Sequence, residues 1–150
     1  MSDLLVKLYD LPGVGAVEGY SVRRPLAHER DRVAEWVGQH FTTGWQSEVA
    51  CAFGEPPTRG WIAIDETTRA IAGFAVYDVV FRGFFGPIGV AESARGRGLG
   101  TALTLRALHS MREAGYAYAV IGGASSVSYY AEAVGAVEIE GSSPGAYPIA

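Results

Sequence analysis

The segment Arg95-Gly96-Arg97-Gly98-Leu99-Gly100-Thr101 has the residue types and spacing best suited to chemistry. It follows an apolar run and opens a stretch with helical periodicity. The N–H groups at a helix start lack intrahelical partners and carry partial positive charge. Glycines let a ligand approach the backbone, and arginines pair with phosphate oxygens through two parallel hydrogen bonds. We interpret the segment as an anion cradle suited to phosphate groups.

The charge distribution supports a compact polyanion rather than a nucleic acid as the ligand. Five arginines and one glutamate lie between Arg82 and Arg112, which gives this stretch a charge of +4, whereas the whole chain carries −4. An acidic protein with one concentrated basic region is unsuited to general nucleic-acid binding. We therefore expect no nucleic-acid partner.

Two other interpretations of the segment are open. A Gly-Arg-Gly run can be an ordinary loop between a strand and a helix. Dinucleotide binding is the second, but the spacing here is G-x-G-x-G and not G-x-G-x-x-G. The next strand also ends in Ile121-Gly122-Gly123, with no carboxylate to hold a ribose.

The elements that must position this segment follow from hydrophobic periodicity and from turn residues. We predict strands at 20–24, 61–64, 71–80, 84–90, 118–121, 137–139 and 147–149, and helices at 27–40, 45–53, 99–114 and from Ser125 or Ser126 to Val134. Pro87 requires a bulge or a free edge in its strand, because it has no N–H. On the third helix, Arg106, His109, Ser110 and Glu113 mark the predicted solvent face. The order predicts a mixed α/β sheet with helices on both faces.

Length and composition exclude several protein classes. The 150 residues suit a single domain, with residues 1–19 as an N-terminal arm. A single cysteine and three scattered histidines exclude a disulfide framework and argue against a metal site. No apolar run reaches the ~20 residues of a membrane span, and the N-terminus lacks signal-peptide features. We expect a cytoplasmic protein without a membrane partner.

The stretch F-G-P-I-G-V-A-E-S-A-R-G-R-G-L-G-T-A-L resembles the acetyl-CoA signature of the GNAT acetyltransferase superfamily. In that family an apolar strand is followed by R/Q-x-x-G-x-G/A at the head of a helix. The later S-Y-Y-A-E-A-V-G-A is similar to the family's Y-x-x-x-G-F segment, and the element order matches from Tyr20 onward. The resemblance implies a GNAT-like fold, with a mostly antiparallel sheet that splays at the cofactor site.

The resemblance also implies an acetyl-CoA site. The backbone of Ile88, Gly89 and Val90 would pair with the pantetheine arm, and an N–H near Val90 would stabilise the thioester oxygen. The diphosphate would lie on Arg95–Thr101, that is on Arg95, Gly96, Arg97, Gly98, Leu99, Gly100 and Thr101.

Tyr130 matches the family's general acid, which protonates the leaving thiolate. Tyr129, its neighbour, is the alternative. Both can also be packing residues at a helix start.

The amine acceptor site is less well defined by the sequence. The candidate bases are Glu48, Asp65, Glu66 and Asp78, none of which is preferred. Phe41, Trp45 and Glu48 are candidates to line the acceptor pocket. Cys51 is interpreted as a small buried hydrophobic residue and not as a nucleophile.

Together these features predict an N-acetyltransferase that moves an acetyl group from acetyl-CoA directly to a primary amine of a small molecule or peptide. The alternative is a non-catalytic acyl-CoA-binding module of the same fold. Dimers are common in the family, so a homodimer is compatible with the resemblance.

Overall fold

The computed structural model describes residues 1–147. Its elements are β1 (Leu4–Lys7), β2 (Tyr20–Arg23), the 3-10 helix η1 (Ala27–Glu29), α1 (Arg30–His40), α2 (Thr43–Cys51), β3 (Gly60–Asp65), β4 (Ile71–Tyr77), β5 (Phe84–Val90), the 3-10 helix η2 (Glu92–Ala94), α3 (Leu99–Glu113), β6 (Tyr118–Ile121), α4 (Val127–Val134) and β7 (Val137–Glu138). Within this part of the chain, no helix combines the length and apolar character needed to cross a bilayer.

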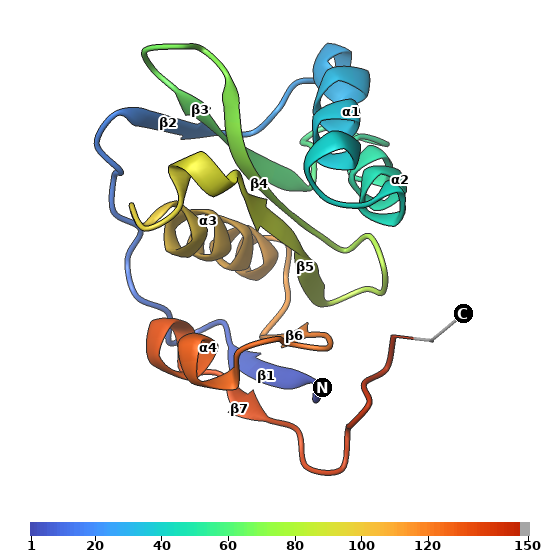
Figure 1. Ribbon diagram of the computed structural model, residues 1–150. Helices are drawn as coiled ribbons and strands as arrows, with labels where there is room; N and C mark the ends of the chain where they lie inside the picture. The colour runs from blue at the N-terminus through green and yellow to red at the C-terminus, as the bar shows by residue number, and fades with distance from the viewer. Residues whose placement is uncertain (148–150) are drawn as a thin grey trace.

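The strands form one sheet in the order β2-β3-β4-β5-β6-β1-β7. Every recorded strand pair is antiparallel except β5 with β6, which run parallel. Helices α1 and α2 lie on one face of the sheet, and α3 lies on the other (Figure 1). The predicted mixed α/β fold with a mostly antiparallel sheet is confirmed.

Two apolar cores hold these layers together, one on each face of the sheet. Leu99, Leu103 and Leu108 of α3 are buried in the first core, and Val37 and Val49 of α1 and α2 are buried in the second. All seven residues of β4 are buried, which explains its continuous apolar sequence, because a strand covered on both faces shows no alternation. The central strands are therefore a rigid base for the segments that follow them.

The predicted N-terminal arm contains a strand. Residues 4–7 form β1, which lies between β6 and β7 and pairs antiparallel with both. Leu4 and Val6 are buried, whereas Leu5 and Lys7 are exposed, so the strand has the alternation of a sheet with one covered face. Four residues are too short a run for this pattern to be decisive in the sequence. The predicted strand at 147–149 is not present at Tyr147, and its other residues lie outside the described part.

The solvent face predicted for α3 is wrong at Ser110. This side chain is buried, and its hydroxyl accepts hydrogen bonds from Arg24 (3.1 Å) and from the indole of Trp61 (2.9 Å). Arg106 lies over the same indole ring, at 5.2 Å from its centroid. This face of α3 is covered by polar residues of the neighbouring strands, which periodicity alone cannot distinguish from water.

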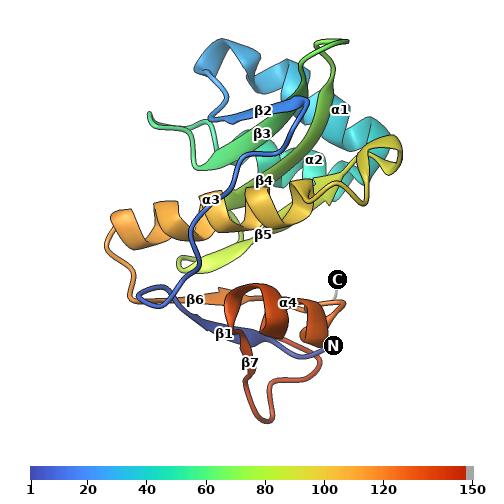
Figure 2. The ribbon, with the colours of Figure 1, turned by 90° about the vertical axis from the view of Figure 1, so that its left-hand side faces the viewer.

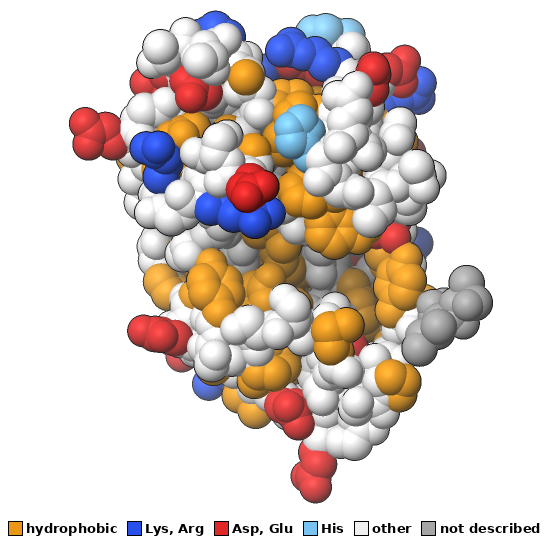
Figure 3. Space-filling view, viewed as in Figure 1, with side chains coloured by type: hydrophobic (Ala, Val, Ile, Leu, Met, Phe, Trp, Pro, Cys, Tyr) orange, Lys and Arg blue, Asp and Glu red, His pale blue; other side chains and the backbone are white. Residues whose placement is uncertain are grey.

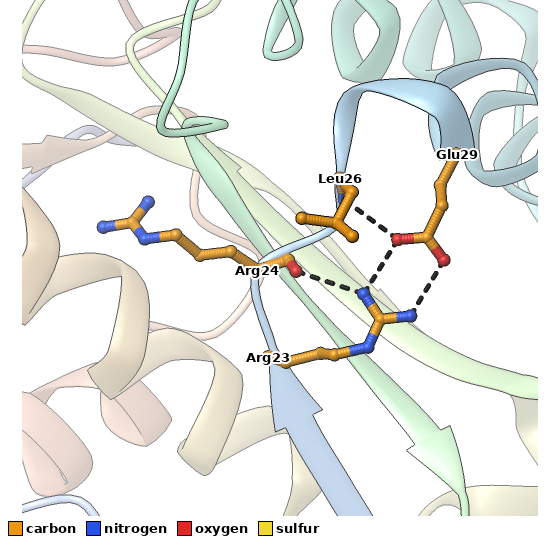
Figure 4. Close-up of polar contacts among 4 residues, drawn as sticks. All are labelled: Arg23, Arg24, Leu26 and Glu29. Atoms are coloured by element: carbon orange, nitrogen blue, oxygen red, sulfur yellow. Dashed lines mark hydrogen bonds and ion pairs between the residues drawn. The ribbon is translucent and has the colours of Figure 1, made fainter.

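The start of α1 is fixed by an ion pair to β2 (Figure 4). Both terminal nitrogens of Arg23 donate to the carboxylate of Glu29 at 2.8 Å, and the same carboxylate accepts from the N–H of Leu26 at 2.9 Å. These hydrogen bonds, led by the Arg23 contact, lower the pKa of Glu29 to about 2. The ion pair therefore ties the segment that leads into α1 to β2, the strand at the edge of the sheet.

Candidate functional site

The sheet opens between β5 and β6. These strands pair only at Phe84 with Val120 and at Phe85 with Ile121, and beyond these residues they diverge (Figure 2). Residues 88–90 of β5 continue to pair with β4 on the other side. One edge of β5 is thus left without a strand partner inside the sheet.

A bulge in β5 marks the point of divergence. Ala75 of β4 pairs with Ile88, and Tyr77 pairs with Phe85, so that Gly86 and Pro87 together lie opposite one residue of β4. Gly86 has a φ of +116°, a backbone conformation that side chains disfavour. The bulge predicted from Pro87 is confirmed, and so is the free edge.

The direction of the free backbone groups follows from the strand alternation. The N–H of Ala91 donates to the carbonyl of Ala72 on the β4 side at 2.8 Å. Since successive residues point to opposite sides, the N–H groups of Val90 and Ile88 face the opening. The carbonyl of Val90 faces it as well and accepts from Nε of Arg95 at 3.2 Å. This edge can accept an extended ligand as an added strand.

The loop before α3 continues from this edge. Gly96 and Gly98 have φ values of +78° and +87°, and a Cβ at either position would meet open space. Within residues 1–147, the N–H groups of residues 96–98 have no recorded hydrogen-bond acceptor. The first three N–H groups of α3 add further donors without intrahelical partners. The segment therefore presents about six amides at the positive end of a 15-residue helix.

The basic region around this loop is smaller than the sequence predicts. Arg95 and Arg97 are exposed beside the amides, and the ion pairs found among the described residues involve neither of them. Arg106 instead packs on Trp61, and Arg112 lies in the last turn of α3, about 20 Å from its start at 1.5 Å per residue. Arg82 lies in the loop between β4 and β5, so the arginines of the cradle are Arg95 and Arg97.

The two adjacent tyrosines of α4 have different surroundings. The hydroxyl of Tyr129 lies 2.7 Å from the hydroxyl of Thr101, at the mouth of the cradle. Tyr130 is partly buried, with its ring against Phe85 of β5 at a centroid distance of 6.5 Å. Ser126 caps the helix by accepting from the N–H of Tyr129 at 3.3 Å, which fixes the first turn that carries both rings.

Burial raises the pKa of Tyr130 to about 12. The phenol therefore keeps its proton across the neutral range. Its hydroxyl has no recorded hydrogen-bond partner among the described residues. Tyr130 is thus a protonated donor beside the base of the opening.

A cavity of about 550 Å³ lies at the base of the opening, on the side of α2. It is lined by Met1, Trp45, Glu48, Val80, Phe84, Phe85, Gly86, Pro87, Gly122, Gly123, Pro144 and Tyr147. Apolar side chains are gathered across the middle of this face of the molecule, between α1–α2 and the β6–β1–β7 part of the sheet (Figure 3). Trp45 and Glu48, two of the three residues predicted for the acceptor pocket, line this cavity.

Phe41 does not line this cavity. Its ring lies on the backbone of Gly89, where a Cβ would come within 2.5 Å of the ring. Phe41 also packs against Trp45 at 5.3 Å and against Phe74 at 5.7 Å between ring centroids. This aromatic cluster holds α2 against β5 and so fixes the position of Trp45 in the cavity wall.

Of the four candidate bases, Glu48 alone lines the cavity. Asp78 accepts from the N–H of Gly83 at 2.7 Å, and Asp65 accepts from the N–H groups of the turn that follows it. Those turn contacts lower the pKa of Asp65. These two carboxylates therefore stabilise the turns in which they lie. Glu66 is exposed on the same turn as Asp65.

The interpretation of Cys51 as a buried residue is wrong. Cys51 ends α2 and is exposed, because the buried face of this short helix runs through Val49 and Ala52. It does not line the cavity.

Several lining residues carry no signal in the sequence. Met1, Val80, Pro144 and Tyr147 come from segments far apart in the chain and meet only through the sheet. The one local signal is the pair of glycines after β6. A Cβ at Gly122 would lie 3.2 Å from the Phe84 ring, so the absence of a side chain there leaves space for that ring.

Solved structures with this arrangement are known. A GCN5-related N-acetyltransferase from Sphaerobacter thermophilus has a TM-score of 0.74 at 19% identity and matches 92% of this chain and 48% of its own. One from Kribbella flavida has a TM-score of 0.65 at 20% identity, over 91% of this chain and 53% of its own. The GNAT family N-acetyltransferase YhbS from Escherichia coli, solved in complex with CoA, has a TM-score of 0.52 at 19% identity, over 70% of this chain and 62% of its own.

The chain thus spans about half the length of the first two of these structures. No curated protein matches it significantly. The model of the Acetyltransferase (GNAT) family matches residues 12–136, which include the sheet opening, the glycine loop and α4. The chain belongs to the GNAT acetyltransferase family.

Proposed function

We propose that this protein transfers an acetyl group from acetyl-CoA directly to a primary amine. One observation carries the proposal: the free edge of β5 is followed, after the short 3-10 helix η2, by the amides of residues 96–101. A coenzyme that joins an extended amide-containing arm to a diphosphate matches both parts in that order.

The residues present fit the coenzyme. The glycines at 96 and 98 leave the space that a diphosphate needs, and Arg95 and Arg97 supply positive charge beside it. The N–H groups of Ile88 and Val90 face the opening, where the pantetheine amides would run. Gly89 fits between this edge and Phe41 because it has no side chain.

Acetyl-CoA supplies the thioester that is cleaved. The ammonium of the acceptor first loses a proton to solvent. The neutral nitrogen then attacks the carbonyl carbon, a C–N bond forms, and the C–S bond breaks. The N–H of Val90, which faces the opening, would stabilise the negative charge on the carbonyl oxygen. Tyr130 provides a proton for the departing sulfur and regains one from the nitrogen. Overall, an ammonium and a thioester give an amide, a thiol and one proton.

Tyr130 is preferred to Tyr129 as the donor because of its surroundings. Tyr130 packs against Phe85 at the base of the opening, whereas the hydroxyl of Tyr129 is engaged with Thr101 on α3. Direct transfer is preferred to an acyl-enzyme route because Cys51 lies outside the cavity. A cytoplasmic location, a homodimer and the assignment of all 150 residues to one domain stay predictions.

The test is a thiol-release assay over a panel of amines with acetyl-CoA, combined with calorimetric titration of CoA. The proposal expects both binding and amine-dependent thiol release. Binding of CoA without thiol release from any amine would instead support a non-catalytic acyl-CoA-binding module. The absence of CoA binding would refute both.

A further inference from the structure

The cavity beside Glu48 limits what kind of amine this protein can accept, if the proposed function holds. Its walls include the bulge of β5, from Phe84 to Pro87, and the glycines after β6. These are the residues where the two strands separate, so the cavity reaches the point at which the thioester would lie. Trp45 and Glu48 of α2 form another part of the wall.

The lining of this cavity is apolar with one exception. Aromatic rings come from Trp45, Phe84, Phe85 and Tyr147, and aliphatic surface comes from valine, methionine and proline side chains. Glu48 is the one charged side chain among the lining residues, and no arginine, lysine or histidine side chain is present in this set. The side chains of the cavity can therefore neutralise one positive charge, and none of them can neutralise a negative one. The α-amino group of Met1 also belongs to a lining residue, but among the described residues it forms no ion pair with Glu48.

The carboxylate of Glu48 is held in place by its neighbour. The hydroxyl of Tyr147 donates a hydrogen bond to Oε1 of Glu48, and this contact raises the pKa of Tyr147. Within residues 1–147, Oε2 of Glu48 has no recorded partner. One carboxylate oxygen is thus oriented from the protein side, and the other is available to a ligand.

These features distinguish amines that carry only the ammonium charge from amines that also carry an acidic group. An ammonium group can donate a charge-assisted hydrogen bond to Oε2. A ligand that also carries a carboxylate or phosphate would place it in an apolar cavity near Glu48, where desolvation and like charge both oppose binding. An aromatic body gains from burial against the rings of the wall.

We infer that the acceptor is a cationic primary amine with an apolar, aromatic-sized body and no acidic group. Glu48 binds its ammonium on entry, before the nitrogen loses the proton that must leave ahead of the attack. Amino acids and phosphorylated amines are poor acceptors for this reason. Small polar amines are poor acceptors because they leave the aromatic walls unfilled.

Three amines test this inference with acetyl-CoA as the donor. 2-Phenylethylamine has the charge and the apolar body, phenylalanine adds a carboxylate to the same skeleton, and ethanolamine lacks the apolar body. We expect kcat/KM for 2-phenylethylamine to exceed that for phenylalanine by about 100-fold and that for ethanolamine by at least about 10-fold. Equal or better turnover of phenylalanine or ethanolamine would overturn the inference.

The role of Glu48 is tested by Glu48→Gln, with Glu35→Gln on the exposed side of α1 as the matched control. We expect Glu48→Gln to lower kcat/KM for 2-phenylethylamine by at least about 10-fold, mainly through KM, because a charge-assisted hydrogen bond is lost. The preference over phenylalanine should also narrow, since the repulsion of the carboxylate is removed. Glu48→Asp should restore part of the activity, and Glu35→Gln should match the wild type.

A merely structural role of Glu48 would lower the activity with both amines equally, and an unchanged preference would therefore overturn the assignment. Calorimetric titration of CoA separates this inference from the proposed function. If CoA binds but 2-phenylethylamine neither reacts nor binds to the CoA complex, the acceptor class is wrong and the coenzyme site stands. If CoA does not bind, the proposed function itself is refuted.

Discussion

The two ends of the opening between β5 and β6 are built from different parts of the chain. At the α3 end, the groups that the structure leaves exposed are backbone amides and glycines within seven consecutive residues, 95–101. At the α2 end, they are side chains of α2, of β5 and of the segment around residue 147, which lie far apart in the sequence. The first end suits one invariant chemical group, and the second end is shaped by whichever side chains meet there.

This difference assigns separate tasks to the two ends. Backbone amides at a helix start bind any diphosphate and leave little scope for variation without loss of the turn. Side chains on a cavity wall can be exchanged while the fold stays the same, and they therefore set the choice of acceptor. Tyr130 and the bulge in β5 lie between the two ends, where the coenzyme and the amine would meet.

Substitution of Tyr130, whose phenol lies between the two ends, should have the largest effect on activity. We expect Tyr130→Phe to lower kcat by about 100-fold or more, because the departing sulfur loses its proton donor, with acetyl-CoA affinity unchanged within about twofold. Steady-state kinetics and calorimetry measure the two quantities. Tyr129→Phe is the matched control and should retain most of kcat. The reverse pattern would assign the proton donor to Tyr129.

A side chain in the glycine loop should affect the coenzyme end alone. Gly98 and Gly115 flank the two ends of α3, both with positive φ and both with open space at the Cβ position. Alanine should therefore strain the backbone at either position and reduce stability by about 1 kcal/mol. Only Gly98→Ala should also lower the affinity for CoA, by about 10-fold, because its Cβ enters the anion cradle.

Calorimetric titration of both variants with CoA is the measurement, with urea unfolding as the control for stability. Similar CoA affinities in the two variants would show that residues 96–101 do not hold the diphosphate.

Phe41 connects the two ends of the opening, because its ring packs against Trp45 of α2 and against the backbone of Gly89 in β5. A Cβ on Gly89 would lie 2.5 Å from the Phe41 ring, which is held by Trp45 and Phe74. We expect Gly89→Ala to reduce the free energy of unfolding by about 1–3 kcal/mol through overpacking. Adding Phe41→Leu should recover part of this loss, and urea unfolding of the four proteins of the cycle measures the coupling. Strictly additive effects would exclude the contact.

The smallest predicted effect concerns the ion pair that fixes the start of α1. The folded-state pKa of Glu29 is about 2, below its ordinary value of 4.5, so its contribution to stability is present above pH 4.5 and is lost as the pH falls toward 2. Because the pair is partly exposed, we expect about 1 kcal/mol.

Urea unfolding of the wild type and of Glu29→Gln measures this contribution. The difference between their unfolding free energies should be largest at neutral pH and should vanish near pH 2. A difference that does not change with pH would show that Arg23 and Glu29 do not form the pair in solution.

A region can be predicted from the sequence when its structure is determined by neighbouring residues, and it cannot when it depends on contacts with distant ones. The glycine loop, α3 and the bulge at Pro87 follow from short-range backbone requirements and were predictable from a few adjacent residues. The β1 strand and the burial of Ser110 depend on partners more than 85 residues away in the sequence, at Ile121 and Arg24. Glu48 and Trp45 were plausible candidates, whereas the Tyr147 contact arises only when the end of the described chain folds back over α2.

The central claim is that the coenzyme lies along the free edge of β5 with its diphosphate on the amides of residues 96–101. A crystal structure of the protein with CoA tests it most directly. The account predicts diphosphate oxygens about 2.9 Å from several of these amide nitrogens, and pantetheine groups paired with Ile88 and Val90. A coenzyme bound elsewhere, or a loop with no diphosphate at saturating CoA, would contradict it.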